Sequence, residues 1–174
     1  MTFPTNTPNG YLSLCYHYIR DNSSEQSFPR ILGTSVDEFE KHVEMFSNFF
    51  KLITPSDALS FSYGDYNFND GEIGLLLTFD DGLSDHYVAA KILAKHGIKA
   101  IFFIPTCILK DELPANPIII HYCIAKFGLS IFLNFLKSSL EKNLKDSNNY
   151  FNKFSYIGGN YNKVIQKIKY FFKY

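Results

Sequence analysis

The sequence has no tryptophan, only three cysteines and no excess of either charge. Lysine and arginine together number 17, as do aspartate and glutamate, so the charge balance does not point to nucleic acid as a partner. The cysteines, Cys15, Cys107 and Cys123, stand far apart, which excludes a C-x-x-C motif and leaves no paired disulfide framework. We expect all three to be reduced and buried as small apolar side chains.

A leader and a membrane-spanning run are also missing from the sequence. Residues 1–10 have neither the basic nor the apolar region of a signal peptide. No apolar run reaches the ~18 residues of a transmembrane helix. These absences predict a cytoplasmic location, with the inner face of a membrane as the alternative.

Apolar and aromatic residues are plentiful, at 46% and 17% of the chain, which is enough to build the core of one domain. Runs of such residues predict strands over 11–19, 73–79 and 99–104. The run at 73–79 does not alternate with polar residues, which is typical of a parallel strand covered on both faces. A helix from an N-cap at Ser84 to Gly97 would join the last two strands into a parallel βαβ unit, in which 99–104 is also buried.

The clearest helical pattern covers residues 35–50, where Ser35 and Glu38 match a capping box. A shorter helical turn capped by Ser56 is expected next, and three helices are predicted over 116–128, 130–144 and 162–174. The apolar stripe expected to face the core in the first helix comprises Val36, Phe39, Val43, Phe46 and Phe50. The inner side expected for the helix after Ser84 comprises Val88, Ala89, Ile92, Leu93 and His96.

Two adjacent carboxylates, Asp80 and Asp81, follow the strand at 73–79 and precede Gly82. The carboxyl ends of parallel strands are where α/β proteins carry their chemistry, and a glycine allows the sharp bend that lets both acids converge. Such a pair is stable when a cation lies beside it, or when one acid binds a metal and the other moves a proton. The alternative is a simple turn in which the acids cap the next helix.

The surroundings of this pair resemble the polysaccharide deacetylase family (carbohydrate esterase family 4, the NodB homology domain). The resemblance rests on "TFDDG" at 78–82 and "ILAKHGIKAIFFIPT" at 92–106, and more loosely on "LCYHYIRD" and "FEKHVEMF" upstream. It implies a hydrolase of carbon–nitrogen bonds that removes N-acetyl groups from a carbohydrate, such as a bacterial cell-surface glycan. It further implies Asp80 as the general base and Asp81 as a ligand of a divalent metal, commonly zinc.

The histidines depart from the family's pattern. The chain has five, and no two are four residues apart, so the H-[ST]-x-x-H metal motif of the family is missing. His17, near the end of the first strand, is the candidate for an additional residue at the same rim, and His86 is a weaker one. The expected roles are surface for His42 and structural for His121.

The fold that this resemblance implies is α/β: a partial, distorted (β/α) barrel with a helical C-terminal insertion region. We expect a flexible arm over 1–10, the N-terminal part of a deacetylase-like domain over 11–110, and a helical insertion over 111–174 that is cut short. Such a part would expose sheet edges and self-associate. The alternatives are a non-catalytic carbohydrate-binding remnant or pseudoenzyme, and a receiver-like phosphoacceptor domain, which the helical second half disfavours.

Overall fold

The structure is a computed structural model that describes residues 9–21, 28 and 31–143 of the 174-residue chain. The helix predicted over 162–174, and nearly all of the arm predicted over 1–10, lie outside these residues. None of the described helices is both long enough and apolar enough to cross a membrane.

A four-stranded parallel sheet organises the described part of the chain. Its central strand is β3 (Gly74–Phe79), which pairs with β1 (Tyr11–Tyr16) along one edge. The other edge of β3 pairs first with β2 (Lys51–Leu52) and then, at its carboxyl end, with β4 (Ile101–Phe102). The α/β class with a parallel sheet is therefore confirmed, and the described sheet is open and not closed into a barrel.

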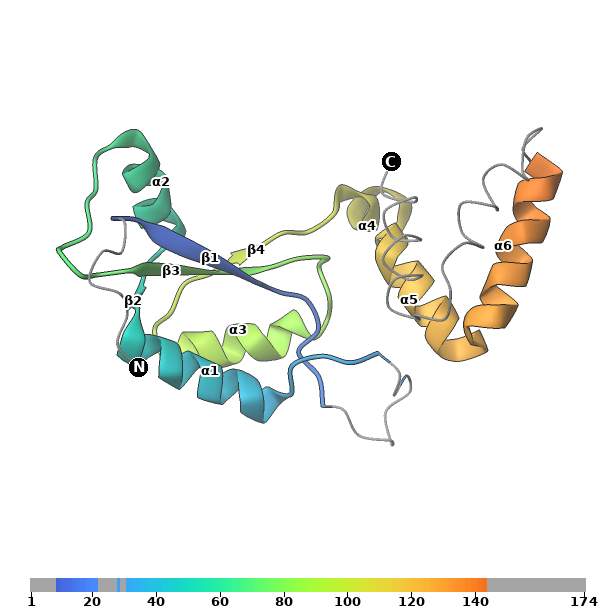
Figure 1. Cartoon of the computed structure of the whole chain (residues 1–174), viewed down its shortest axis with the longest axis horizontal. Helices are drawn as coiled ribbons and strands as arrows, with labels where there is room; N and C mark the ends of the chain where they lie inside the picture. The colour runs from blue at the N-terminus through green and yellow to red at the C-terminus, as the bar shows by residue number, and fades with distance from the viewer. Residues whose placement is uncertain (1–8, 22–27, 29–30, 144–174) are drawn as a thin grey trace.

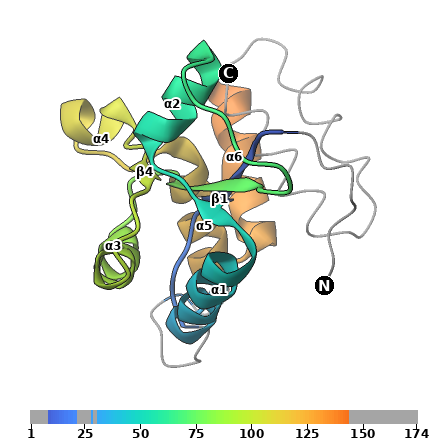
Figure 2. The same ribbon diagram turned by 90° about the vertical axis from the view of Figure 1, so that its left-hand side faces the viewer.

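Helices cover both faces of this sheet. Figure 2 shows α1 (Val36–Phe49) and α3 (His86–Lys95) on one side and α2 (Pro55–Tyr63) on the other. After β4 the chain continues into α4 (Thr106–Asp111), α5 (Asn116–Phe127) and α6 (Leu129–Asn143). These three helices lie beyond the carboxyl ends of the strands (Figure 1).

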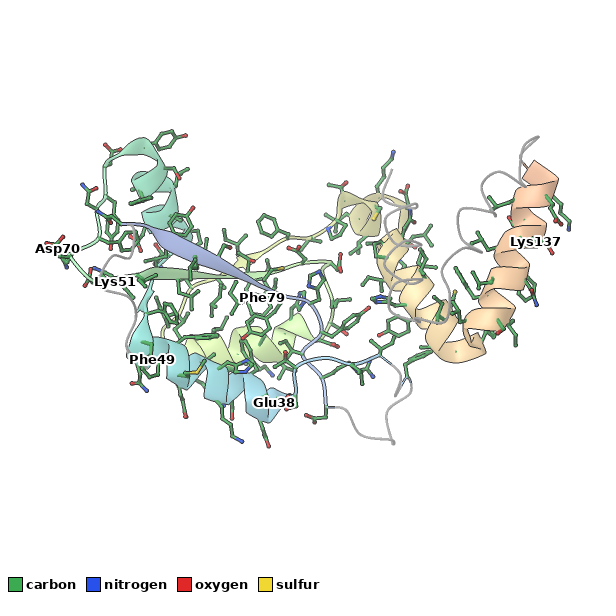
Figure 3. All side chains as sticks on the ribbon, in the orientation of Figure 1. Glu38, Phe49, Lys51, Asp70, Phe79 and Lys137 are labelled. Atoms are coloured by element: carbon green, nitrogen blue, oxygen red, sulfur yellow. The ribbon has the colours of Figure 1, made fainter. Side chains whose placement is uncertain are left out.

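Strand β3 is buried along its whole length because each of its faces meets a separate cluster of apolar side chains. Leu75, Leu77 and Phe79 pack into the cluster made with α1 and α3, whereas Leu76 packs into the cluster made with α2. Phe79, labelled in Figure 3, is fully buried and stacks on Phe102 with ring centroids 4.7 Å apart. The lack of alternation in the sequence is thus explained by two covered faces.

Helix α1 forms where the sequence predicts it. Ser35 and Glu38 make the reciprocal capping box, in which the Ser35 side chain accepts a hydrogen bond from the Glu38 backbone N–H. Phe39, Val43 and Phe46 are buried in the main core. The outer members of the predicted stripe, Val36 and Phe50, are partly buried and pack against that core.

Two predicted helix caps are wrong. Helix α2 is capped by Thr54, whose side chain accepts from the backbone N–H of Asp57, and Ser56 lies inside the helix. Pro55 explains the difference, because its fixed φ suits the first helical position and places the cap at Thr54, two residues earlier than predicted. Helix α3 begins at His86 after a turn that includes Ser84, and its N-cap Asp85 makes no side-chain capping bond.

The strand predicted over 99–104 is shorter and less buried than expected. Only Ile101 and Phe102 pair with β3, and both are partly exposed. Phe103 and Ile104 are 53% and 56% exposed because the chain leaves the sheet before Pro105. In α3, Val88 and His96 are exposed, and His86 lies on the buried side instead.

Candidate functional site

The carboxyl ends of β1 and β3 bring the predicted rim residues together. In the parallel register Cys15 pairs with Thr78, so their side chains lie on the same face of the sheet. Two residues further on, His17 and Asp80 follow on that face. The backbone N–H of Asp80 donates to the carbonyl of Tyr16 at 3.0 Å, which extends the pairing of the two strands past β3.

Three different ligand types converge there. The Cys15 sulfur, a ring nitrogen of His17 and a carboxylate oxygen of Asp80 all lie within 4.8 Å of one another. The Cys15 Sγ and the His17 Nδ1 are 3.9 Å apart. Within the described ranges, this is the one group of three or more such side chains close enough to share a metal ion.

Asp81 turns away from β3 but stays beside the same histidine. Its φ of 76° and that of Gly82, 59°, are left-handed, so the chain bends sharply directly after Asp80. The Asp81 Oδ2 lies 3.9 Å from the His17 Nε2. A side chain at Gly82 would be strained at that φ and would also meet the Ile108 Cδ1 at 3.1 Å. Both acids therefore lie close to the His17 ring.

His86 is a support for this rim and not a member of it. Its Nε2 donates to the backbone carbonyl of His17 at 2.7 Å. The His86 ring is buried, 5.3 Å from the ring centroid of Phe79 and 6.1 Å from that of Phe102. His86, the weaker candidate for a ligand, is therefore interpreted as a residue that positions the His17 backbone.

The remaining described histidines lie outside this cluster. His42 is not simply a surface residue, because it is partly buried and hydrogen-bonded to the Tyr16 hydroxyl at 3.0 Å. His121 is hydrogen-bonded to the Tyr18 hydroxyl at 2.9 Å, which agrees with the structural role expected for it. His96, at the end of α3, is exposed.

The prediction of three buried cysteines is wrong. Cys15 is exposed, and Cys107 and Cys123 are intermediate, although all three are free thiols as expected. Partial burial of its sulfur raises the pKa of the Cys15 thiol, and the carboxylates of Asp80 and Asp81 add to this, against a hydrogen bond with Thr78 that lowers it. The strand period could have revealed Cys15, because it stands two residues before His17.

An open pocket of about 690 Å³ begins at Asp81, the second acid of the pair. Asp81 and Gly82 form one side of it, and the α4–α5 region forms the rest. Its size is in the range of small-molecule sites, and its lining is mainly apolar. The lining residues from the α4–α5 region include Ile108, Leu113, Ile118, Ile119 and Tyr122.

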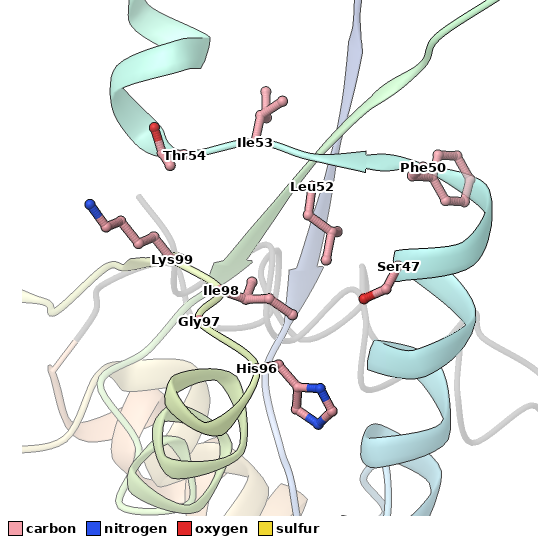
Figure 4. A pocket seen from close by; sticks show the side chains of 9 residues that line it. All are labelled: Ser47, Phe50, Leu52, Ile53, Thr54, His96, Gly97, Ile98 and Lys99. Carbon is pink, nitrogen blue, oxygen red and sulfur yellow. The ribbon is translucent and has the colours of Figure 1, made fainter.

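A second, smaller cavity of about 290 Å³ lies at the opposite end of the strands. Figure 4 shows its lining from the end of α1, from β2 and from the segment between α3 and β4. Ligands of parallel α/β folds bind at the carboxyl ends of strands, and this cavity lies at the amino ends. The pocket beside Asp81 is therefore the better candidate for a substrate.

Comparison with protein-family models and with curated proteins gives no match. Several solved structures are similar to part of the chain. A de-N-acetylase from Aggregatibacter actinomycetemcomitans is 24% identical over 53% of this chain and 36% of its own, with a TM-score of 0.43. The deacetylase PplD of Streptococcus pyogenes, in complex with acetate, is 23% identical over 66% of this chain and 50% of its own, with a TM-score of 0.46.

A polysaccharide deacetylase from Bacillus cereus is 27% identical over 49% of this chain and 24% of its own, with a TM-score of 0.36. The chain thus spans between a quarter and a half of the length of these structures. It resembles polysaccharide deacetylases over part of its length, as its sequence motifs indicate.

Proposed function

We propose that this chain contributes the acid-pair half of a metal-dependent hydrolase that removes N-acetyl groups from a carbohydrate. The observation that carries the proposal is the position of the "TFDDG" acids, Asp80 and Asp81, at the carboxyl end of the central parallel strand. A further support is the pocket of about 690 Å³ that begins at Asp81 and could receive a sugar.

Hydrolysis of an acetamide requires a base for the attacking water and stabilisation of the negative charge that develops on the carbonyl oxygen. The two acids can divide this work, with one accepting the proton and the other holding a metal. The family resemblance gives the base to Asp80 and the metal to Asp81. The proximity of Asp80 to Cys15 and His17 favours the opposite assignment, with Asp80 as the metal ligand and Asp81 as the base.

The residues present fit a divalent metal. Zinc in catalytic sites takes three protein ligands drawn from sulfur, nitrogen and oxygen, and Cys15, His17 and Asp80 offer one of each. Cys15 and His17 are both exposed, so an ion can reach them from solvent. When bound, such a metal polarises the acyl carbonyl and lowers the pKa of bound water.

The same proposal extends to the fold. The open sheet of β1, β2, β3 and β4 would be part of a distorted (β/α) barrel, with residues 11–110 as the deacetylase-like part. Residues 111–174 would form the helical insertion, in which α5 and α6 lie. Strand edges at the open sides of this sheet would be covered by further barrel strands or by another chain.

The direct test is acetate release from an N-acetylated chito-oligosaccharide by the whole chain with zinc. The variants Asp80→Asn and Asp81→Asn remove one carboxylate each, and we expect each to lower the rate by at least ~100-fold, the usual contribution of acid–base catalysis. Asp70→Asn is the matched control, because Asp70 is an exposed carboxylate at the far end of the sheet (Figure 3).

Each result separates the alternatives. Acetate release that falls in both acid variants but not in the control supports the hydrolase. Binding of the oligosaccharide without release of acetate replaces the hydrolase by the non-catalytic carbohydrate-binding remnant. Release that is the same in all four proteins contradicts the role of the acid pair.

A further inference from the structure

The chain has no pair of histidines four residues apart, yet its acid pair lies beside two other side chains of the kinds that bind metals, Cys15 on β1 and His17 directly after it. We propose that Cys15, His17 and Asp80 form a thiolate-containing site for a thiophilic divalent cation such as zinc. This inference deepens the proposed function. The catalytic role of the metal rests on that proposed function, whereas the metal site itself rests on the geometry of β1 and β3.

The strand register creates the site. Cys15 lies on β1 and His17 directly follows this strand, two residues further on, so both side chains lie on the same face. The pairing of Cys15 with Thr78 places Asp80 opposite His17. The main chain at each of these points is fixed by strand bonds or by the hydrogen bond from His86 to the His17 carbonyl. The three ligands are thus carried on backbone that is held by hydrogen bonds, and the side chains of Cys15 and His17 are exposed.

The charges around the cluster favour a cation. Asp80 and Asp81 are adjacent, and Asp81 Oδ2 lies 3.9 Å from His17 with its side chain only 19% exposed. Two carboxylates and a thiol in one partly buried corner repel each other when ionised, and a divalent ion removes that repulsion.

The chemistry of the three ligands selects the class of metal. A thiolate, an imidazole and a carboxylate together suit zinc or cobalt, whereas magnesium and calcium take oxygen ligands. Three protein ligands leave a fourth position for water or substrate, as in catalytic zinc sites. Asp81 stays outside the ligand set and within reach of the rim, where it could accept a proton.

Cobalt(II) titration of the whole chain tests this inference without substrate. A cobalt–thiolate bond gives a sulfur-to-cobalt charge-transfer band in the near ultraviolet, which reports the sulfur ligand directly. We expect the band in the unmodified chain and its loss on addition of zinc. Cys15→Ser should abolish the band, and the matched control Cys107→Ser should retain it.

His17→Gln and Asp80→Asn should weaken cobalt binding by more than about tenfold, because even residues that only support a ligand contribute 10- to 100-fold. Asp81→Asn should retain the band. Circular dichroism melts of each variant establish that the fold is kept. A missing band in the unmodified chain, a band that survives Cys15→Ser, or a band lost in Asp81→Asn but kept in Asp80→Asn would overturn the site.

This outcome is separable from that of the proposed function. A cobalt–thiolate band without acetate release leaves the metal site standing and contradicts the hydrolase. Metal-dependent acetate release that is unchanged by Cys15→Ser supports the hydrolase and contradicts the thiolate site.

Discussion

The buried position of the Asp85 carboxylate destabilises the folded state when this group is ionised. Its Oδ2 is buried and has no hydrogen-bond partner among the described residues. Burial raises the pKa of Asp85, and the charge of Arg20 opposes this only in part. The folded chain therefore holds the Asp85 proton more tightly than the unfolded chain does.

The pH dependence follows from that direction. Protonated Asp85 contributes fully to the free energy of unfolding below the pKa of an unfolded aspartate, about 3.9. That contribution is lost as the pH rises through the higher pKa of Asp85 in the folded state. Asp85→Asn should thus raise the Tm at pH 7 by a few degrees, and the gain should shrink toward pH 3. Thermal melts at both pH values check this, with Asp70→Asn as an exposed control. A lower Tm at pH 7 in Asp85→Asn would show that this carboxylate stabilises the fold.

His86 gives a second prediction at the scale of one residue. His86→Leu removes the donor to the His17 carbonyl and leaves that carbonyl without its bond, at a cost of about 1–3 kcal/mol in unfolding free energy. His86→Gln can keep a donor near the Nε2 position and should recover part of that loss. Denaturant unfolding measures the stability, and cobalt affinity reports whether His17 has moved. Equal cobalt affinity in both variants would argue against a positioning role.

At the scale of single elements, the cap of α2 distinguishes the structure from the sequence pattern. Thr54→Ala removes the side-chain oxygen that accepts from the Asp57 N–H and should cost about 1 kcal/mol. Ser56→Ala is the matched control, because Ser56 is exposed within the helix and should change stability little. Urea unfolding of the two variants decides between the caps, and a larger loss in Ser56→Ala would favour the cap predicted from sequence.

The same cap has a pH dependence of opposite sign to that of Asp85. The backbone hydrogen bond from Thr54, followed by its hydroxyl, lowers the pKa of Asp57. Because its pKa is lowered, Asp57 stabilises the fold at pH values above its unfolded-state pKa. This stabilisation is lost as the pH falls through the pKa of Asp57 in the folded state. The difference in stability between Thr54→Ala and the unmodified chain should therefore decrease in acid.

Elements with a strong periodic pattern could be predicted from the sequence, and their boundaries could not. The stripe of α1 and the unbroken apolar run of β3 reflect burial of whole faces, which local residues encode. The start of α2 follows from Pro55, a local signal that the prediction of a cap at Ser56 did not use. The length of β4 depends instead on its pairing with β3, a tertiary contact that a local window of sequence does not contain.

The candidate site shows the same division. Asp80, Asp81 and the nearness of His17 could be predicted because the motif and the carboxyl ends of parallel strands point to one rim. Cys15 was missed because an isolated cysteine is usually buried, and only the register with Thr78 shows that it faces the rim. His86 could not be assigned, since its bond to the His17 backbone joins segments that are 69 residues apart.

At the scale of the whole molecule, the exposed apolar surface predicts self-association. Among the described strands β1 pairs only with β3, and Leu12 on β1 is 55% exposed. Unpaired strand edges with apolar side chains pair readily with other chains. Sedimentation velocity should show oligomers that Leu12→Lys reduces. Leu59→Lys is the control, because Leu59 is 57% exposed but lies on α2. A monomer with a sharp cooperative melt would contradict this prediction.

The central claim is that the carboxyl ends of β1 and β3 form one metal site. Anomalous diffraction at the zinc absorption edge, from crystals of the whole chain grown with zinc, locates the ion directly. The account predicts an anomalous peak between Cys15 Sγ, the His17 ring and the Asp80 carboxylate, with Asp81 beside it. A zinc ion bound elsewhere, or a rim that stays without zinc when the metal is in excess, would contradict it.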